Sequence, residues 1–73
     1  MKELENIGNS LRKHRFLNDE MTQQELADAV GVSRQTIVTL EKGQYNPSIA
    51  LALRLAKLFN VRVEELFYLE EGK

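Results

Sequence analysis

A glycine turn between two short helix patterns constrains the fold of this chain more than any other feature of its sequence. The first pattern starts with Thr22 and Glu25, which have the spacing of a capping box. Gly31 follows its apolar residues, and glycine adopts the left-handed conformation that ends many helices at little cost. We therefore predict a helix over residues 23–30.

The second pattern begins directly after this turn. Ser33 can accept a hydrogen bond from the first turn of a helix, and Gly43 stands where that helix would end. The pattern predicts a second helix over about 34–42. Two short helices joined by a tight turn that contains glycine are typical of a helix-turn-helix.

Helical periodicity also extends to both sides of this pair. Leu4, Ile7 and Leu11 recur at the interval of one helix face, so we expect an amphipathic helix over about 4–17. A last short helix is expected over about 63–67.

The most apolar part of the chain predicts the central helix. Nine of the eleven residues from Ile49 to Phe59 are apolar, which indicates a helix surrounded by protein. Asn46 can cap this helix and Pro47 fits a first turn, where its missing N–H is not needed. We therefore expect the helix over about 47–59.

The composition indicates one small domain that efficient packing or a partner must stabilise. The 73 residues include no Cys and one His, so no disulfide, metal site or cofactor is expected. The longest apolar run, 49–53, is far shorter than the roughly 20 residues that span a bilayer, so no membrane association is expected. The predicted fold is all-α, a compact domain of five helices over residues 1–73, in the cytoplasm.

Charge and catalytic patterns narrow the class of function. The net charge is −1 and no basic block is present, so nucleic-acid binding must depend on the local placement of a few charges. His14 has no partners for a catalytic triad and is expected at the edge of the core. Glu64 and Glu65 would diverge by about 100° on a helix. We therefore expect no enzyme activity.

The predicted helix over 34–42 has two unlike sides. At about 100° per residue, its apolar side contains Ile37 and Leu40. The opposite side carries side chains suited to base edges in a major groove: Arg34, Gln35, Val38, Thr39 and Lys42. Arginine pairs with guanine, glutamine pairs with adenine, and a methyl group contacts thymine. On residue type alone, a simple solvated face remains the alternative.

The same region carries an ordered set of residues with a known pattern. The set comprises Thr22-Gln23-Gln24-Glu25-Leu26-Ala27, Val30-Gly31-Val32-Ser33-Arg34-Gln35-Thr36-Ile37, Leu40-Glu41-Lys42-Gly43 and Asn46-Pro47-Ser48. It resembles the Cro/phage-repressor type of helix-turn-helix regulators, the xenobiotic-response-element family, over about residues 5–69. The resemblance implies a DNA-binding transcriptional regulator, usually a dimer on a palindromic operator.

The resemblance also implies roles for individual residues. The positions that match its base-reading residues are Arg34, Gln35 and Thr39, with Val38 beside them. The positions that match its contacts to the DNA backbone are Gln23, Thr36, Lys42, Tyr45 and Asn46. Arg15 and Glu41 match a structural ion pair between the end of the first helix and the end of the recognition helix.

An apolar surplus near residue 70 has two explanations. The residues in question are Leu66, Phe67, Tyr68 and Leu69. They can complete a small core, or they can form a two-fold dimer contact through the last helix or through a short strand that pairs with its symmetry mate. We expect the dimer contact.

The expected partners follow from these assignments. We expect double-stranded DNA and a second copy of the chain, with an unknown protein partner also open. The alternative function is a protein-interaction module, such as an antitoxin, for which DNA binding is secondary.

Overall fold

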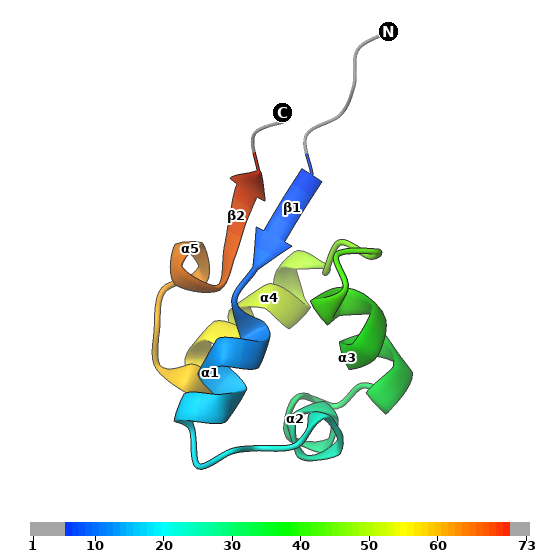
Figure 1. The fold of residues 1–73 in the computed structure, drawn as a ribbon, viewed down its shortest axis with the longest axis vertical. Coiled ribbons are helices and arrows are strands. Elements are labelled where there is room, and N and C mark those ends of the chain that lie inside the picture. The colour runs from blue at the N-terminus through cyan, green and yellow to red at the C-terminus, as the bar shows by residue number, and fades with distance from the viewer. Residues whose placement is uncertain (1–5, 71–73) are drawn as a thin grey trace, which may run out of the picture.

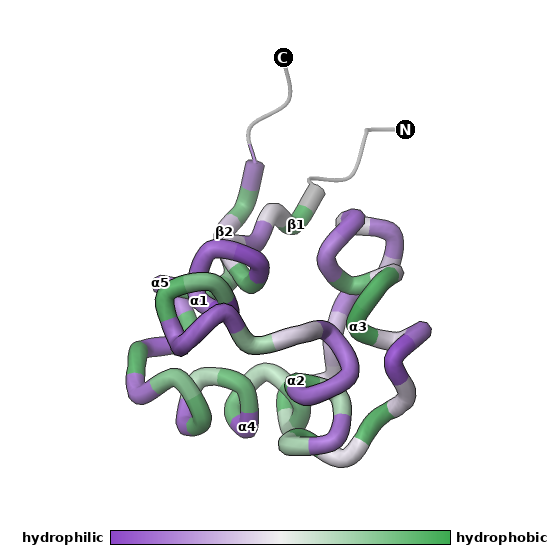
Figure 2. The backbone as a smooth tube through the Cα atoms, turned by 60° about the horizontal axis from the view of Figure 1, so that its bottom comes forward, coloured by the Kyte–Doolittle hydropathy of each residue, from purple (hydrophilic) through white to green (hydrophobic). Residues whose placement is uncertain are grey.

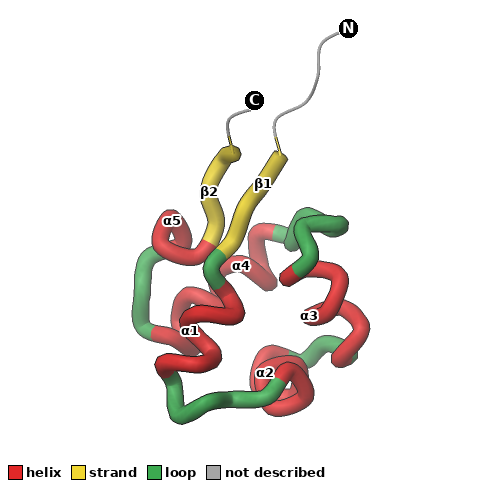
Figure 3. The backbone as a smooth tube through the Cα atoms, viewed as in Figure 1, coloured by secondary structure: helices red, strands yellow, loops and turns green. Residues whose placement is uncertain are grey.

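The computed structural model describes residues 6–70, which form five helices and a two-stranded sheet (Figures 1 and 3). In chain order the elements are β1 (Asn6–Asn9), α1 (Leu11–Leu17), α2 (Gln23–Val30), α3 (Arg34–Glu41), α4 (Ile49–Phe59), α5 (Val63–Leu66) and β2 (Phe67–Glu70). The predicted helical fold of five helices is confirmed, and the small sheet is an addition to it.

The helix pair α2 and α3 forms where its local signals predicted it. Thr22 accepts a hydrogen bond from the Glu25 amide, and the Glu25 carboxylate accepts one from the Thr22 amide, which completes the capping box. Gly31 ends α2 with a φ of 78°, a conformation that a Cβ would strain. Ser33 then caps α3 by accepting from the Thr36 amide. The chain therefore turns sharply between the two helices.

One apolar core joins all five helices. Its fully buried large side chains are Leu11, Leu26, Ile37, Leu40, Leu55 and Leu66. The helix α4 contributes four buried residues and contacts both α2 and α5, and Figure 2 shows its backbone coloured as hydrophobic over most of its length. This helix thus supplies one side of the core, but the prediction that protein surrounds it is wrong, because Ile49 and Leu53 on its other side are 79% and 55% exposed. The core holds the back of α3 in place.

The predicted first helix is wrong over its first half. Residues 4 and 5 of that prediction lie outside the described residues, and Asn6–Asn9 form β1. This strand pairs antiparallel with β2, with Ile7 opposite Leu69 and Gly8 opposite Tyr68. Glycine and asparagine favour helices weakly, so pairing with a distant strand overrides the apolar periodicity.

Two predicted helix ends also differ from the structure. Ser48, and not Asn46, caps α4 by accepting a hydrogen bond from the Leu51 amide at 3.0 Å, so this helix begins two residues later than predicted. The helix α5 ends at Leu66, because Phe67 is extended and begins β2.

No helix within residues 6–70 has both the length and the apolar character needed to cross a membrane.

Candidate nucleic-acid interface

The helix α3 presents its polar side to solvent. Ile37 and Leu40 on its back are at most 1% exposed, which fixes the rotation of the helix about its axis. Arg34 and Gln35 are exposed in the first turn of the helix, and Val38 and Thr39 are half-buried further along the same side. The structure therefore brings the four predicted base-reading residues together on one surface.

The hydroxyl groups on α3 already have partners within the chain. Thr39 Oγ1 donates to the carbonyl oxygens of Gln35 or Thr36, each 3.1 Å away. The Thr36 hydroxyl lies 3.0 Å from the Ser33 hydroxyl at the start of the helix. With its proton directed to the helix backbone, Thr39 offers a methyl group and an acceptor oxygen to a ligand.

The start of α2 has two amides available to an anion. The capping box satisfies the amides of Thr22 and Glu25. The amides of Gln23 and Gln24 lie between them in the first turn, where a helix provides no acceptor for its N–H groups. Such amides, together with the positive end of the helix dipole, suit a phosphate group.

An ion pair connects α1 to the end of α3. Arg15 Nε lies 2.7 Å from Glu41 Oε2, and the two side chains are 14% and 10% exposed. The same guanidinium donates to Glu41 Oε1 at 3.0 Å and to the Met21 carbonyl at 2.9 Å. The predicted partners thus meet in a two-pronged contact, which also holds the loop before α2.

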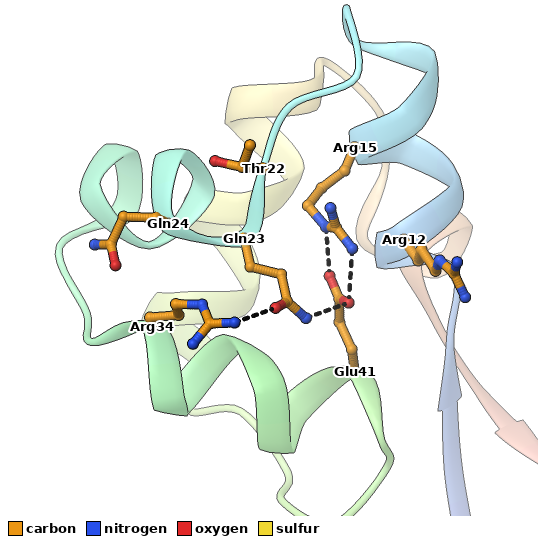
Figure 4. Close-up of a pocket in the computed structure, with 7 residues that line it drawn as sticks. All are labelled: Arg12, Arg15, Thr22, Gln23, Gln24, Arg34 and Glu41. Carbon is orange, nitrogen blue, oxygen red and sulfur yellow. Dashed lines mark hydrogen bonds and ion pairs between the residues drawn. The ribbon is translucent and has the colours of Figure 1, made fainter.

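Gln23 connects this ion pair to Arg34 on the exposed side of α3 (Figure 4). Its side-chain amide donates from Nε2 to Glu41 Oε1 at 3.2 Å, and its Oε1 accepts from an Arg34 guanidinium nitrogen at 3.5 Å. Glu41 therefore holds the Gln23 amide, and the far end of that amide is within reach of Arg34. The sequence indicated that Gln23 contacts the DNA backbone but carried no signal for this link, because the link depends on side-chain geometry between α2 and α3.

These residues surround an open pocket of about 520 Å³ between α1, α2 and α3. The lining residues are Arg12, Arg15, Thr22, Gln23, Gln24, Arg34 and Glu41. Six of them belong to the helix-turn-helix pattern or to the ion pair that the sequence indicated, whereas no role was assigned to Arg12 on α1. The pocket combines arginine side chains with the first turn of α2, which is an arrangement suited to a polyanion.

The other residues predicted to contact the DNA backbone lie at the end of α3 and after it in the chain. Lys42, Tyr45 and Asn46 are exposed, with Tyr45 42% exposed. They lie at the end of α3 and in the loop that leads to α4, and Gly43 enters this loop with a φ of 76°. These side chains are therefore accessible to a ligand that lies against α3.

The four residues of the predicted dimer contact have different environments. Leu66 is fully buried in the core of its own chain and is removed from the contact for that reason. Phe67 is half-buried and packs against the same core, while Tyr68 and Leu69 are 47% and 60% exposed. A strand forms in this segment, over Phe67–Glu70, but it pairs with β1 of the same chain and not, as had been predicted, with a symmetry mate.

His14, which was expected at the edge of the core, packs beside an aromatic ring of α4. His14 is half-buried, and its ring centroid lies 5.7 Å from that of Phe59. Its Nδ1 lies 2.9 Å from the Ser10 carbonyl oxygen. Within residues 6–70, no three acidic or histidine side chains gather closely enough to hold a metal ion.

The tight turn between α2 and α3, with the exposed front of α3, defines a helix-turn-helix protein. The helix-turn-helix family model matches residues 17–66, more than half of the chain. An uncharacterized HTH-type transcriptional regulator of Methanocaldococcus jannaschii is 48% identical over 67 residues, which are 92% of this chain and 100% of that protein. The cryptic phage CTXphi transcriptional repressor of Vibrio cholerae is 38% identical over 56 residues, 77% of this chain and 47% of that protein.

Solved structures show the same fold. The restriction-modification controller protein of Aeromonas hydrophila superposes with a TM-score of 0.66 and 31% identity, over 75% of this chain and 82% of that chain. The transcriptional regulator VanUg superposes with a TM-score of 0.73 over 99% of this chain and 100% of that chain, and its 21% identity makes it a comparison of fold alone.

The chain belongs to the helix-turn-helix transcriptional regulators of the Cro/phage-repressor type, as the sequence predicted. This family consists of regulators, and the expectation that the chain is not an enzyme is confirmed by that membership.

Proposed function

We propose that this chain is a sequence-specific regulator of transcription that binds double-stranded DNA with the recognition helix, residues 34–42, in the major groove. The observation that carries the proposal is the exposed polar front of α3, whose back is fixed in the core by Ile37 and Leu40. A helix-turn-helix places its second helix in the major groove, where the first residues of that helix contact base edges.

The side chains on the exposed side of α3 suit different bases. Arg34 suits the O6 and N7 acceptors of guanine, and Gln35 suits adenine. Thr39 directs its hydroxyl proton to the helix backbone, so its methyl group and that of Val38 suit the methyl group of thymine. The Arg34 guanidinium also lies 3.5 Å from Gln23 Oε1, at the edge of the same surface.

A second set of groups contacts the DNA backbone in this proposal. The set comprises Gln23, Thr36, Lys42, Tyr45 and Asn46, together with the first-turn amides of α2. Phosphate contacts fix the register of a protein on DNA without reading sequence. Because the net charge is −1, attraction to DNA depends on this local surface and not on the protein as a whole.

The regulator acts as a homodimer on a palindromic operator in this proposal. Two recognition helices related by a two-fold axis would lie about 34 Å apart, one turn of DNA. The exposed side chains of Tyr68 and Leu69 on β2, with Phe67 at their edge, support a contact between copies at this strand. We place the protein in the cytoplasm, in the same compartment as its DNA.

Selection of duplexes from a random library tests the proposal. We expect enrichment of an inverted repeat whose half-sites lie one helical turn apart. A dimer with 6–10 phosphate contacts should also lose about 10³–10⁵ in affinity between 50 and 200 mM salt. Binding to no duplex in the pool, or binding that salt leaves unchanged, would contradict the proposal and favour a protein-interaction module such as an antitoxin.

A further inference from the structure

We infer that Arg12, on α1, forms an additional contact with the DNA backbone beside the phosphate held at the start of α2. This inference rests on the proposed DNA-binding function and extends the contact surface beyond the helix-turn-helix itself. It concerns a residue that neither the sequence motif nor the apolar patterns singled out.

The first observation is position. Arg12 lines the same pocket as Gln23, Gln24 and Arg34, although α1 precedes the helix-turn-helix in the chain (Figure 4). The folding of α1 against the motif therefore places an arginine on the surface proposed to bind DNA. A duplex that lies against α3 and the first turn of α2 passes this pocket.

The second observation is the distribution of charge around the pocket. Among the described residues that line the pocket, Glu41 is the only acidic one, and its carboxylate is bound by Arg15 and Gln23. Within residues 6–70, neither Arg12 nor Arg34 forms an ion pair, although the net charge of the chain is −1. Such a local positive surface attracts phosphate groups.

The adjacent residue provides an internal comparison. Arg12 and Lys13 are both exposed cations on α1, and successive helical residues diverge by about 100°. Arg12 lines the pocket, and Lys13 is absent from its lining. A simple effect of net charge would be the same for both residues, whereas a contact at the pocket depends on Arg12 alone.

The test compares Arg12→Gln with Lys13→Gln in the full chain. Affinity for the selected operator and for an unrelated duplex is measured between 50 and 200 mM salt, and circular dichroism verifies the fold of each variant. We expect Arg12→Gln to weaken binding to both duplexes alike and to reduce the salt slope by about 0.9 for each copy bound. When the salt is raised from 50 to 200 mM, the affinity of Arg12→Gln should therefore fall about 3.5-fold less, per copy, than the affinity of the unaltered protein. Lys13→Gln should retain the slope of the unaltered protein.

Each other outcome overturns the inference in a different way. Equal slopes for Arg12→Gln and the unaltered protein would show that Arg12 contacts no phosphate. Equal reductions in both variants would show a general effect of charge. A changed base preference in Arg12→Gln would make Arg12 a reader of sequence. In all three cases the unaltered protein still binds DNA, whereas binding to no duplex overturns the proposed function itself.

Discussion

Arg15 and Glu41 lie 26 residues apart in the chain and form a two-pronged ion pair that joins the end of α1 to the end of the recognition helix. Because Gln23 continues this contact to Arg34, the pair connects the packing of the helices to a residue proposed to read bases. The helix packing and the proposed base reading thus involve one set of hydrogen bonds.

Glu41→Ala should destabilise the fold. The Arg15 side chain is 14% exposed in the intact protein, and the change removes the carboxylate that it binds. Loss of one partner from a buried pair costs about 3–5 kcal/mol. We expect a loss near the lower end of that range, about 3 kcal/mol, in urea unfolding. Glu64→Ala, at an exposed site on α5, serves as the control and should change stability by no more than about 0.5 kcal/mol. A loss below about 1 kcal/mol for Glu41→Ala would contradict a supporting role for the pair.

Arg34→Ala and Lys42→Ala should affect DNA binding in different ways. Loss of a bidentate contact to guanine costs about 1–3 kcal/mol and should relax the preference at one base pair of each half-site. Loss of a phosphate contact at Lys42 should weaken binding to all sequences alike and reduce the salt slope by about 1 per copy. Competition binding against single-base operator variants separates the two. An unchanged base preference in Arg34→Ala would refute the assignment of Arg34 to base reading.

Leu69→Lys should separate the proposed dimer. Burial of a leucine side chain is worth about 1.5–3 kcal/mol, and a two-fold interface contains the substituted residue twice. We therefore expect the dissociation constant of the dimer to rise by at least about tenfold in sedimentation experiments. Leu53→Lys on α4 is a matched control, because Leu53 is 55% exposed and Leu69 is 60% exposed. Dissociation by Leu53→Lys with no effect of Leu69→Lys would assign the contact to α4 instead.

Gly8→Ala should weaken the sheet. Gly8 lies opposite Tyr68 in the β1–β2 register, and a Cβ at Gly8 would collide with the Tyr68 ring. The Tyr68 hydroxyl donates to the Asn9 carbonyl at 3.3 Å, which restrains the ring in this place. We expect a loss of about 1–3 kcal/mol in thermal unfolding, as for other overpacked sites.

The Tyr68→Ala background supplies the control for this prediction. Without the ring, the cost of Gly8→Ala should fall markedly, which a double-mutant cycle measures directly. An equal cost in both backgrounds would show that the ring is not the cause.

The helix-turn-helix was predictable from sequence because its determinants are local. The capping box of Thr22 and Glu25 and the left-handed turn at Gly31 each act within a few residues, and the helix between them has its predicted bounds. The exposed front of α3 followed from helical periodicity alone, once Ile37 and Leu40 had been assigned to the core.

The sheet was not predictable, because its determinants are distant in sequence. Ile7 and Leu11 fit the interval of a helix, and only the pairing of Ile7 with Leu69 makes the first of them part of a strand. The start of α4 shows a smaller ambiguity, since Asn46 and Ser48 are both good capping residues on either side of a proline. The link from Glu41 through Gln23 to Arg34 depends on side-chain conformations that sequence spacing does not specify.

The antiparallel ladder of β1 and β2 has a consequence for the order of folding. Tyr68, whose hydroxyl donates to the Asn9 carbonyl, is 59 residues from Asn9 in the chain, and all five helices lie between the two strands. Closing so long a loop costs entropy that only a preformed helical body can offset, so the strands should assemble last. For the same reason their amides should be among the first to exchange with solvent deuterium under native conditions.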